Sequence, residues 1–233
     1  MKRRGMAGKV HRFFRKNNFI YLFVSLTILL FVSTVILELP GHTGSDLFSV
    51  VTLLMIVVSV QSVKHKFDWK RIFYILALIF IVLALLSRFQ ESHVYVVLLL
   101  LTLLIFFIVM FIVIAREVLF EGDIDLNKVI GSISLYMLIG LTWAIIYLML
   151  LTYDPKTFSG IEVGSWQEVF ASVSYYSFVT LTTLGYGDIL PQKHVAEFFA
   201  YMEAIVGVFY MAIIVASLVS LQMADIQEKR RGK

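Results

Sequence analysis

The stretch Thr182-Thr183-Leu184-Gly185-Tyr186-Gly187-Asp188 decides how the rest of the chain is interpreted. Gly185 and Gly187 stand one residue apart, and glycine adopts left-handed backbone conformations without a steric penalty. Leu184 and Tyr186 take ordinary conformations between them, so the backbone alternates in handedness and turns successive carbonyls toward one axis. Thr183 adds a hydroxyl at the inner end. Because one chain contributes only one line of oxygens, the motif predicts a closed ring of identical chains.

The composition indicates a membrane protein. Of the 233 residues, 60% are hydrophobic, and the mean hydropathy of +0.89 is too high for a soluble domain of this size. A helix that spans the hydrocarbon core needs about 20 apolar residues. The candidate runs are residues 19–39, 47–63, 72–86, 94–115, 129–151 and 195–221. We therefore predict an all-α transmembrane fold with six membrane-spanning helices, of which the third is short and extends into flanking aromatic residues.

A seventh, shorter helix is predicted between the last two runs. Ser165-Trp166-Gln167-Glu168 is a capping box, with serine at the cap and glutamate three residues later. It predicts a helix over residues 166–181, which is too short to cross the bilayer. We expect this helix to be re-entrant: it enters the bilayer about halfway, and residues 182–188 return toward the side from which it entered. Irregular backbone at that depth is tolerated where it lines a water-filled path. Its C-terminal end carries about half a negative charge, which favours a cation.

In this setting, residues 182–188 resemble the pore signature of tetrameric potassium channels, with Leu184 where valine is commonest. A glycine turn before a helix is the alternative, but it explains only Gly-X-Gly and not all seven residues. The resemblance implies a fourfold symmetric homotetramer that conducts K⁺ passively, with K⁺ as the permeant ligand, no other cofactor and no enzymatic activity. The implied selectivity filter consists of Thr182, Thr183, Leu184, Gly185, Tyr186, Gly187 and Asp188. The K⁺ sites would lie at Thr183, Leu184, Gly185 and Tyr186.

The resemblance also implies residues that support the filter. Tyr175 and Tyr176 stand where relatives carry two aromatic residues that brace it. The Tyr175 hydroxyl would then bond Asp188, whereas ordinary packing of both rings is the alternative. Glu203 is an ionisable residue at membrane depth and is therefore a functional candidate. We expect it behind the filter, near pore-helix hydroxyls such as that of Thr180.

The last apolar run is expected to line the cavity and form the gate. Gly207 follows Asp188 by nineteen residues, the spacing at which relatives place a hinge glycine. Close helix packing is a competing reason for a glycine at this position. The resemblance places further residues at the cavity or inner constriction, where an apolar ring can gate by dewetting: Met211, Val215, Val219 and Met223.

The predicted organisation is that of a six-segment channel subunit. Its parts are a basic arm (1–18), a four-helix peripheral domain (19–115), a linker (116–128), a pore domain (129–223) and a tail (224–233). A voltage-sensing fourth helix carries Arg or Lys at every third position, and steep gating needs three to four such charges per subunit. Residues 94–115 contain no Arg or Lys, so the sequence predicts a voltage-insensitive channel.

The distribution of basic residues predicts the orientation. All but three of the 20 Lys and Arg residues fall in residues 1–18, 64–71, 116–128 and 222–233. Because short cytoplasmic loops collect Lys and Arg, both termini are expected in the cytoplasm of a multi-pass cell-membrane protein. The basic arm anchors this orientation or, alternatively, contacts anionic lipid. No nucleic-acid partner is expected. The sequence has no cysteine, and its five histidines lack metal-binding spacing.

Two neighbouring classes fit the sequence less well. Non-selective cation channels replace the Gly-Tyr-Gly core, which this chain retains at residues 185–187. Potassium-uptake transporters usually carry four degenerate pore repeats in one polypeptide, whereas this sequence has one copy. The compact form is similar to that of prokaryotic members of the channel family.

Overall fold

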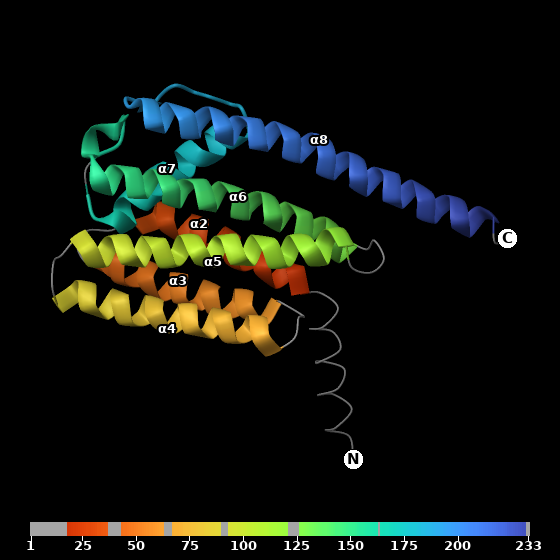
Figure 1. The fold of residues 1–233 in the computed structure, drawn as a ribbon, viewed down its shortest axis with the longest axis horizontal. Coiled ribbons are helices and arrows are strands. Elements are labelled where there is room, and N and C mark those ends of the chain that lie inside the picture. Colours follow the sequence, from red (N-terminus) through yellow and green to blue (C-terminus); the bar gives the residue numbers. More distant parts are fainter. Residues whose placement is uncertain are drawn as a thin grey trace, which may run out of the picture.

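The computed structural model describes residues 18–36, 43–62, 67–89, 93–120, 126–162 and 164–231, which form seven α-helices (Figure 1). The helices are α2 (Asn18–Ile36), α3 (Thr43–Ser62), α4 (Phe67–Phe89), α5 (His93–Phe120), α6 (Leu126–Tyr153), α7 (Trp166–Leu181) and α8 (His194–Arg231). A 3-10 turn, η1 (Pro155–Thr157), and strands β1 (Phe158–Ser159) and β2 (Leu190–Pro191) complete the described elements. The described part of every predicted apolar run lies in a helix, and the all-α class is confirmed.

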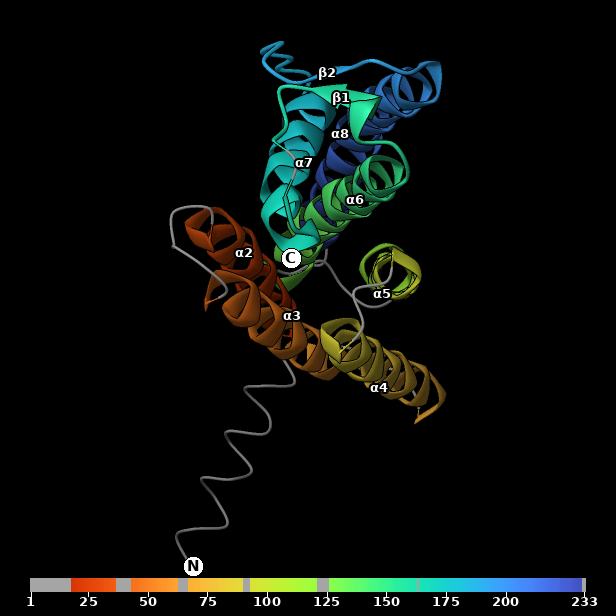
Figure 2. The ribbon, with the colours of Figure 1, turned by 90° about the vertical axis from the view of Figure 1, so that its left-hand side faces the viewer.

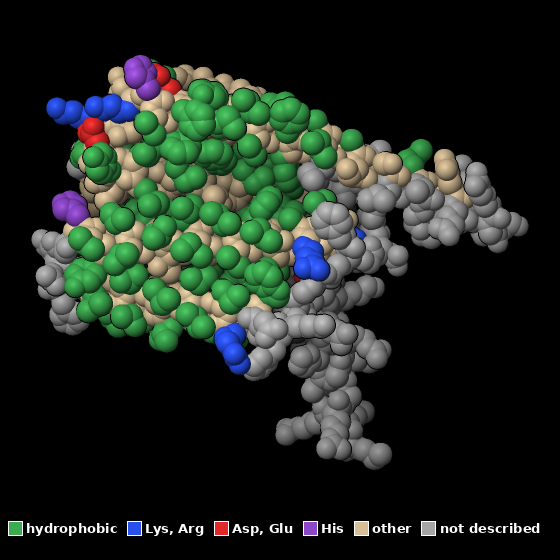
Figure 3. Space-filling model, in the orientation of Figure 1, with side chains coloured by type: hydrophobic (Ala, Val, Ile, Leu, Met, Phe, Trp, Pro, Cys, Tyr) green, Lys and Arg blue, Asp and Glu red, His purple; other side chains and the backbone are tan. Residues whose placement is uncertain are grey.

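The apolar helices are those of a membrane protein. Three stretches are long and apolar enough to cross a bilayer: His93–Leu119, Asn127–Tyr153 and His194–Ile213. The apolar parts of α2, α3 and α4 are shorter: Phe19–Val35, Leu47–Gln61 and Arg71–Ser87. Figure 3 shows hydrophobic side chains along the flank of the helices and charged side chains gathered at the two ends. This distribution matches an apolar slab between two aqueous phases, while the count of six crossings stays a prediction.

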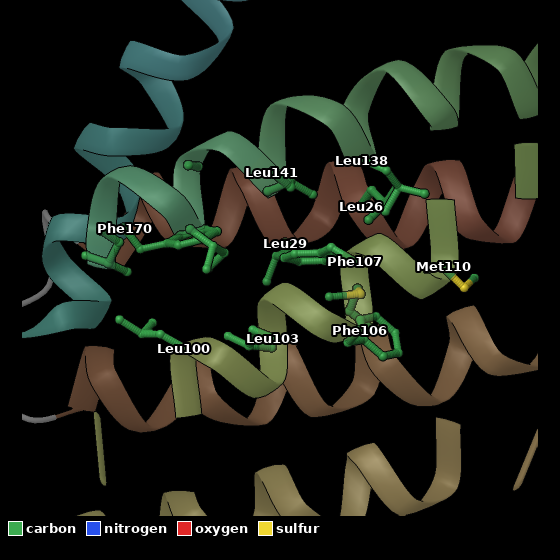
Figure 4. Close-up of a cluster of buried hydrophobic side chains, with 14 of the residues drawn as sticks. Leu26, Leu29, Leu100, Leu103, Phe106, Phe107, Met110, Leu138, Leu141 and Phe170 are labelled. Atoms are coloured by element: carbon green, nitrogen blue, oxygen red, sulfur yellow. The ribbon is translucent and has the colours of Figure 1, made fainter. Parts of the chain in front are cut away.

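Helices α2, α3 and α5 of the predicted peripheral domain pack against α6 and α7 of the same chain. Helices α2 to α5 each contact the next helix, and both α2 and α5 contact α6 (Figures 1 and 2). The buried cluster in Figure 4 joins four helices through Leu26, Leu29, Leu100, Leu103, Phe106, Phe107, Met110, Leu138, Leu141 and Phe170. On α3, the Phe48 ring lies 5.6 Å from Trp166 and 5.1 Å from Phe170, centroid to centroid. The start of α7 is therefore held by the peripheral domain.

The structure distributes the predicted linker between two helices. Residues 116–120 continue α5, and residues 126–128 begin α6, while residues 121–125 lie outside the described ranges. Burial explains the extension, because Val118 is buried and packs close to Gly131 of α6. Asn127 accepts a hydrogen bond from the Phe19 N–H at 3.1 Å, which satisfies a donor in the first turn of α2. Residues 1–17 of the predicted basic arm and residues 232–233 of the tail also lie outside the described ranges.

Candidate functional site

Helix α7 begins with the predicted capping box. The Ser165 N–H donates to Glu168 Oε2 at 2.8 Å, and the Ser165 side chain accepts from the backbone of Glu168. Each contact satisfies a polar group that the first helical turn leaves without a partner. The buried face of the helix is lined by Val169, Phe170, Val173 and Ser177. The predicted helix over residues 166–181 is confirmed.

The chain reverses tightly where α7 ends. The Thr183 N–H donates to the Thr180 carbonyl at 2.9 Å. The Val179 carbonyl accepts from Leu184 N–H at 2.9 Å and from Gly185 N–H at 3.3 Å. These bonds satisfy carbonyls that the helix end leaves free and fix the inner end of residues 182–188 directly against α7.

The backbone of residues 183–187 alternates in handedness. Thr183, Gly185 and Gly187 have φ values of 61°, 56° and 79°, and Leu184 and Tyr186 lie between them with ordinary negative φ. The sequence indicated the two glycines but missed Thr183, because a β-branched residue rarely adopts positive φ. Holding Thr183 there costs about 1–3 kcal/mol, a strain typical of functional sites. The sequence signal that could have indicated Thr183 is the spacing of the two glycines, because continuing the alternation two residues before Gly185 reaches Thr183.

The two tyrosines of α7 have different surroundings. The Tyr175 hydroxyl donates to Asp188 Oδ2 at 2.7 Å, which is the contact that the channel resemblance implied. Tyr176 is buried, and its ring lies 5.1 Å from both Tyr147 and Phe158, centroid to centroid. The structure therefore brings Tyr175 to the outer end of the candidate filter and places Tyr176 in an aromatic cluster.

The segment before α7 holds the chain that follows the candidate filter. Strands β1 and β2 pair antiparallel, with Ser159 opposite Leu190. Gly160 has φ of 82°, and a Cβ there would overlap the Asp188 carbonyl oxygen. Lys193 Nζ lies 3.2 Å from Asp154 Oδ2. The Lys156 N–H, followed by the Lys193 side chain, lowers the pKa of Asp154.

Glu203 lies against α7, but its hydroxyl partner on that helix differs from the expected one. Its side chain is 0% exposed and touches the hydroxyls of Ser177 on α7 and Tyr147 on α6. Thr180 is not one of the two residues whose hydroxyls contact the Glu203 carboxyl group. The register of the two helices explains the difference. Gly207 of α8 packs against Leu181 of α7. One helical turn earlier on each helix, Glu203 and Ser177 therefore lie side by side.

The predicted hinge glycine is a close packing point. A Cβ at Gly207 would overlap the Leu181 carbonyl oxygen at the end of α7, and α8 runs through this position without a break. Met211 and Met223 are exposed on the single chain. Val215 and Val219 also belong to α8, but their side chains lie outside the described part of the structure. The cavity-lining role of these four residues stays a prediction.

Removing the Tyr175 hydroxyl should raise the pKa of Asp188 at the outer end of the site. The Tyr175 hydrogen bond holds the pKa of Asp188 below its ordinary value of 3.8. A lowered pKa means that the bond contributes stability at neutral pH and loses it as pH falls through the Asp188 pKa. In Tyr175→Phe, acid inactivation of ion flux from the outer side should therefore have a midpoint at higher pH than in the wild type. Tyr153→Phe, which removes an exposed hydroxyl, is the control, and equal midpoints in the wild type and Tyr175→Phe would contradict the expectation.

The comparison with known families agrees with this geometry. Residues 134–223 match the family model described as "Ion channel". The match runs from α6 into α8 and includes α7, residues 182–188, Glu203 and Gly207. No curated protein and no solved structure matches the chain. Together with the apolar helices, the match supports an ion channel in a membrane.

Proposed function

We propose that the chain is one subunit of a homotetrameric, potassium-selective channel that conducts K⁺ passively. The observation that carries the proposal is the alternating backbone of residues 183–187, with positive φ at Thr183, Gly185 and Gly187. Alternating handedness turns successive carbonyls to the same side of the chain, and rings of carbonyls replace the hydration shell of K⁺ in selective filters. The K⁺ sites would lie at Thr183, Leu184, Gly185 and Tyr186.

The surface that one chain leaves uncovered supports the proposed ring of four copies. Leu184 and Tyr186 are 58% and 67% exposed, although they are large apolar residues in a tightly bonded segment. A Cβ at Gly185 or Gly187 would meet no atom of the same chain within 4 Å. Closed cyclic symmetry would cover these residues with neighbouring copies and surround the ion with oxygens on all sides. In this arrangement, α7 would point its negative C-terminal end toward the axis.

The peripheral helices give no sign of a charged voltage sensor. Residues 94–115 of α5 carry no Arg or Lys, so moving arginines would not gate this pore. We place the protein in the cell membrane with six crossings and both termini in the cytoplasm, on the basis of the positive-inside rule. Anionic lipid is the proposed contact of the basic N-terminal arm.

The test of the proposal is ion flux in reconstituted liposomes. Purified full-length protein should pass K⁺ at least about a hundredfold faster than Na⁺, a ratio that corresponds to about 2.7 kcal/mol. Empty liposomes are the control, and mass measurement of the solubilised protein should give four copies. Equal fluxes of K⁺ and Na⁺ would contradict potassium selectivity and favour a weakly selective cation channel.

A further inference from the structure

The carboxyl group of Glu203 lies at the junction of three helices. Oε2 lies 2.6 Å from the Tyr147 hydroxyl of α6, and Oε1 lies 2.5 Å from Ser177 Oγ of α7. Ser177 Oγ also lies 2.7 Å from the Gly140 carbonyl oxygen of α6. Every one of these atoms belongs to one chain, and Glu203 is 0% exposed. The cluster is therefore complete without a neighbouring subunit.

The three short contacts in this cluster indicate whether the Glu203 carboxyl group carries a proton. Two oxygens approach to 2.5–2.7 Å only when a hydrogen lies between them, so the three contacts need three hydrogens. The hydroxyls of Tyr147 and Ser177 supply one each, and the Gly140 carbonyl supplies none. The third hydrogen must come from Glu203. It completes a chain in which Tyr147 donates to Oε2, Oε1 donates to Ser177, and Ser177 donates to Gly140.

Within the part of the chain that the structure describes, no cationic side chain acts on the Glu203 carboxyl group. The Lys193–Asp154 and His194–Glu197 ion pairs do not involve Glu203, whose two carboxyl oxygens contact hydroxyl groups. The titratable side chains that face it are tyrosines: Tyr147 and Tyr136 on α6, and Tyr176 on α7. A buried carboxylate without a cation is strongly disfavoured, whereas a neutral acid that donates and accepts is satisfied.

We infer that Glu203 is a neutral carboxylic acid that positions α7 by linking α8 to α6 and α7 through two hydrogen bonds, while a third bond joins Ser177 of α7 to Gly140 of α6. Ser177 stands one turn before the end of α7, from which residues 182–188 begin. Fixing Ser177 fixes the depth of that end and hence the inner end of the candidate filter. Glu203 is a positioning residue, and its effect on ion selection rests on the proposed function. The protonation of Glu203 is inferred from the hydrogen bonds alone and does not rest on the proposed function.

Glutamine is the variant that separates a neutral acid from a carboxylate. In Glu203→Gln, the amide NH₂ donates to Ser177 and the amide oxygen accepts from Tyr147, so all three bonds survive. Potassium flux should stay within about twofold of wild type, whereas Glu203→Ala should lose about tenfold or more. Glu197→Gln is the matched control, because the Glu197 side chain lies on the same helix and is 51% exposed. A loss in Glu203→Gln as large as that in Glu203→Ala would overturn the inference.

Infrared spectroscopy of the full-length protein in lipid reads the proton directly. The spectrum of wild type minus Glu203→Gln at neutral pH should contain the C=O stretch of a protonated carboxylic acid. The spectrum of wild type minus Glu197→Gln should contain carboxylate bands instead. Carboxylate bands at Glu203 would overturn the inference. This readout does not depend on ion flux, so a wild type that passes no potassium overturns the proposed function while the infrared band still decides the state of Glu203.

Discussion

Liposomes that contain the Gly185→Asp variant should pass at least about a hundredfold less potassium than wild type. Gly185 has φ of 56°, and a side chain in that conformation costs about 1–2 kcal/mol in each chain. In the proposed tetramer this cost arises four times, and four new side chains crowd the ring that would hold K⁺. Because each 1.36 kcal/mol changes a rate tenfold, strain alone reaches the stated loss.

The single chain should tolerate this substitution. A Cβ at Gly185 would meet no atom of its own chain within 4 Å, so expression and helix content should match wild type. Ser159→Asp is the matched control, since it adds the same carboxylate at the exposed residue of β1 and keeps an acceptor for the Gln192 amide, which lies 3.0 Å from Ser159 Oγ. Gly185→Ala separates backbone strain from charge. Potassium flux in Gly185→Asp equal to that in Ser159→Asp would refute a conducting role for residues 182–188.

The sequence predicted the helices well because the membrane simplifies the pattern. Long apolar runs have one stable backbone in hydrocarbon, the α-helix, since every N–H and C=O must be satisfied within the segment. The start of α7 was also predictable, because a capping box acts through residues only three positions apart. The third predicted run, residues 72–86, is extended in α4 to Phe67 and Phe89, as expected from the shortness of the run.

The features that the sequence left open depend on contacts between distant segments. Whether Glu203 meets Thr180 or Ser177 depends on how far α8 slides along α7, and that register is set by Gly207 against Leu181. Likewise, no local pattern indicates that Phe48 of the peripheral domain packs on Trp166 and Phe170. Positive φ at Thr183 runs against its local preference and is imposed by the hydrogen bonds to α7.

The contact that sets this register predicts a second large effect, at Gly207. A Cβ added by Gly207→Ala would overlap the Leu181 carbonyl oxygen, which also accepts a hydrogen bond from Tyr136 at 3.1 Å. The Leu181 carbonyl oxygen is a backbone atom and cannot rotate out of the way as a side chain can, so α8 must shift away from α7. Overpacking of this kind costs about 1–3 kcal/mol, and each kcal/mol lowers the melting temperature of a chain this size by about 2–4 °C.

Gly140 provides the comparison that separates packing from hinge motion. Its Cβ would come within 2.6 Å of the Phe178 ring, which is a side chain that can shift. Gly140→Ala should therefore lower the melting temperature less than Gly207→Ala, measured by thermal unfolding of both purified proteins. If Gly207 were only a hinge, alanine would alter potassium flux and leave the melting temperature unchanged, because alanine favours the helix. The unbroken α8 and the Leu181 contact favour packing, so we expect melting temperature and flux to fall together.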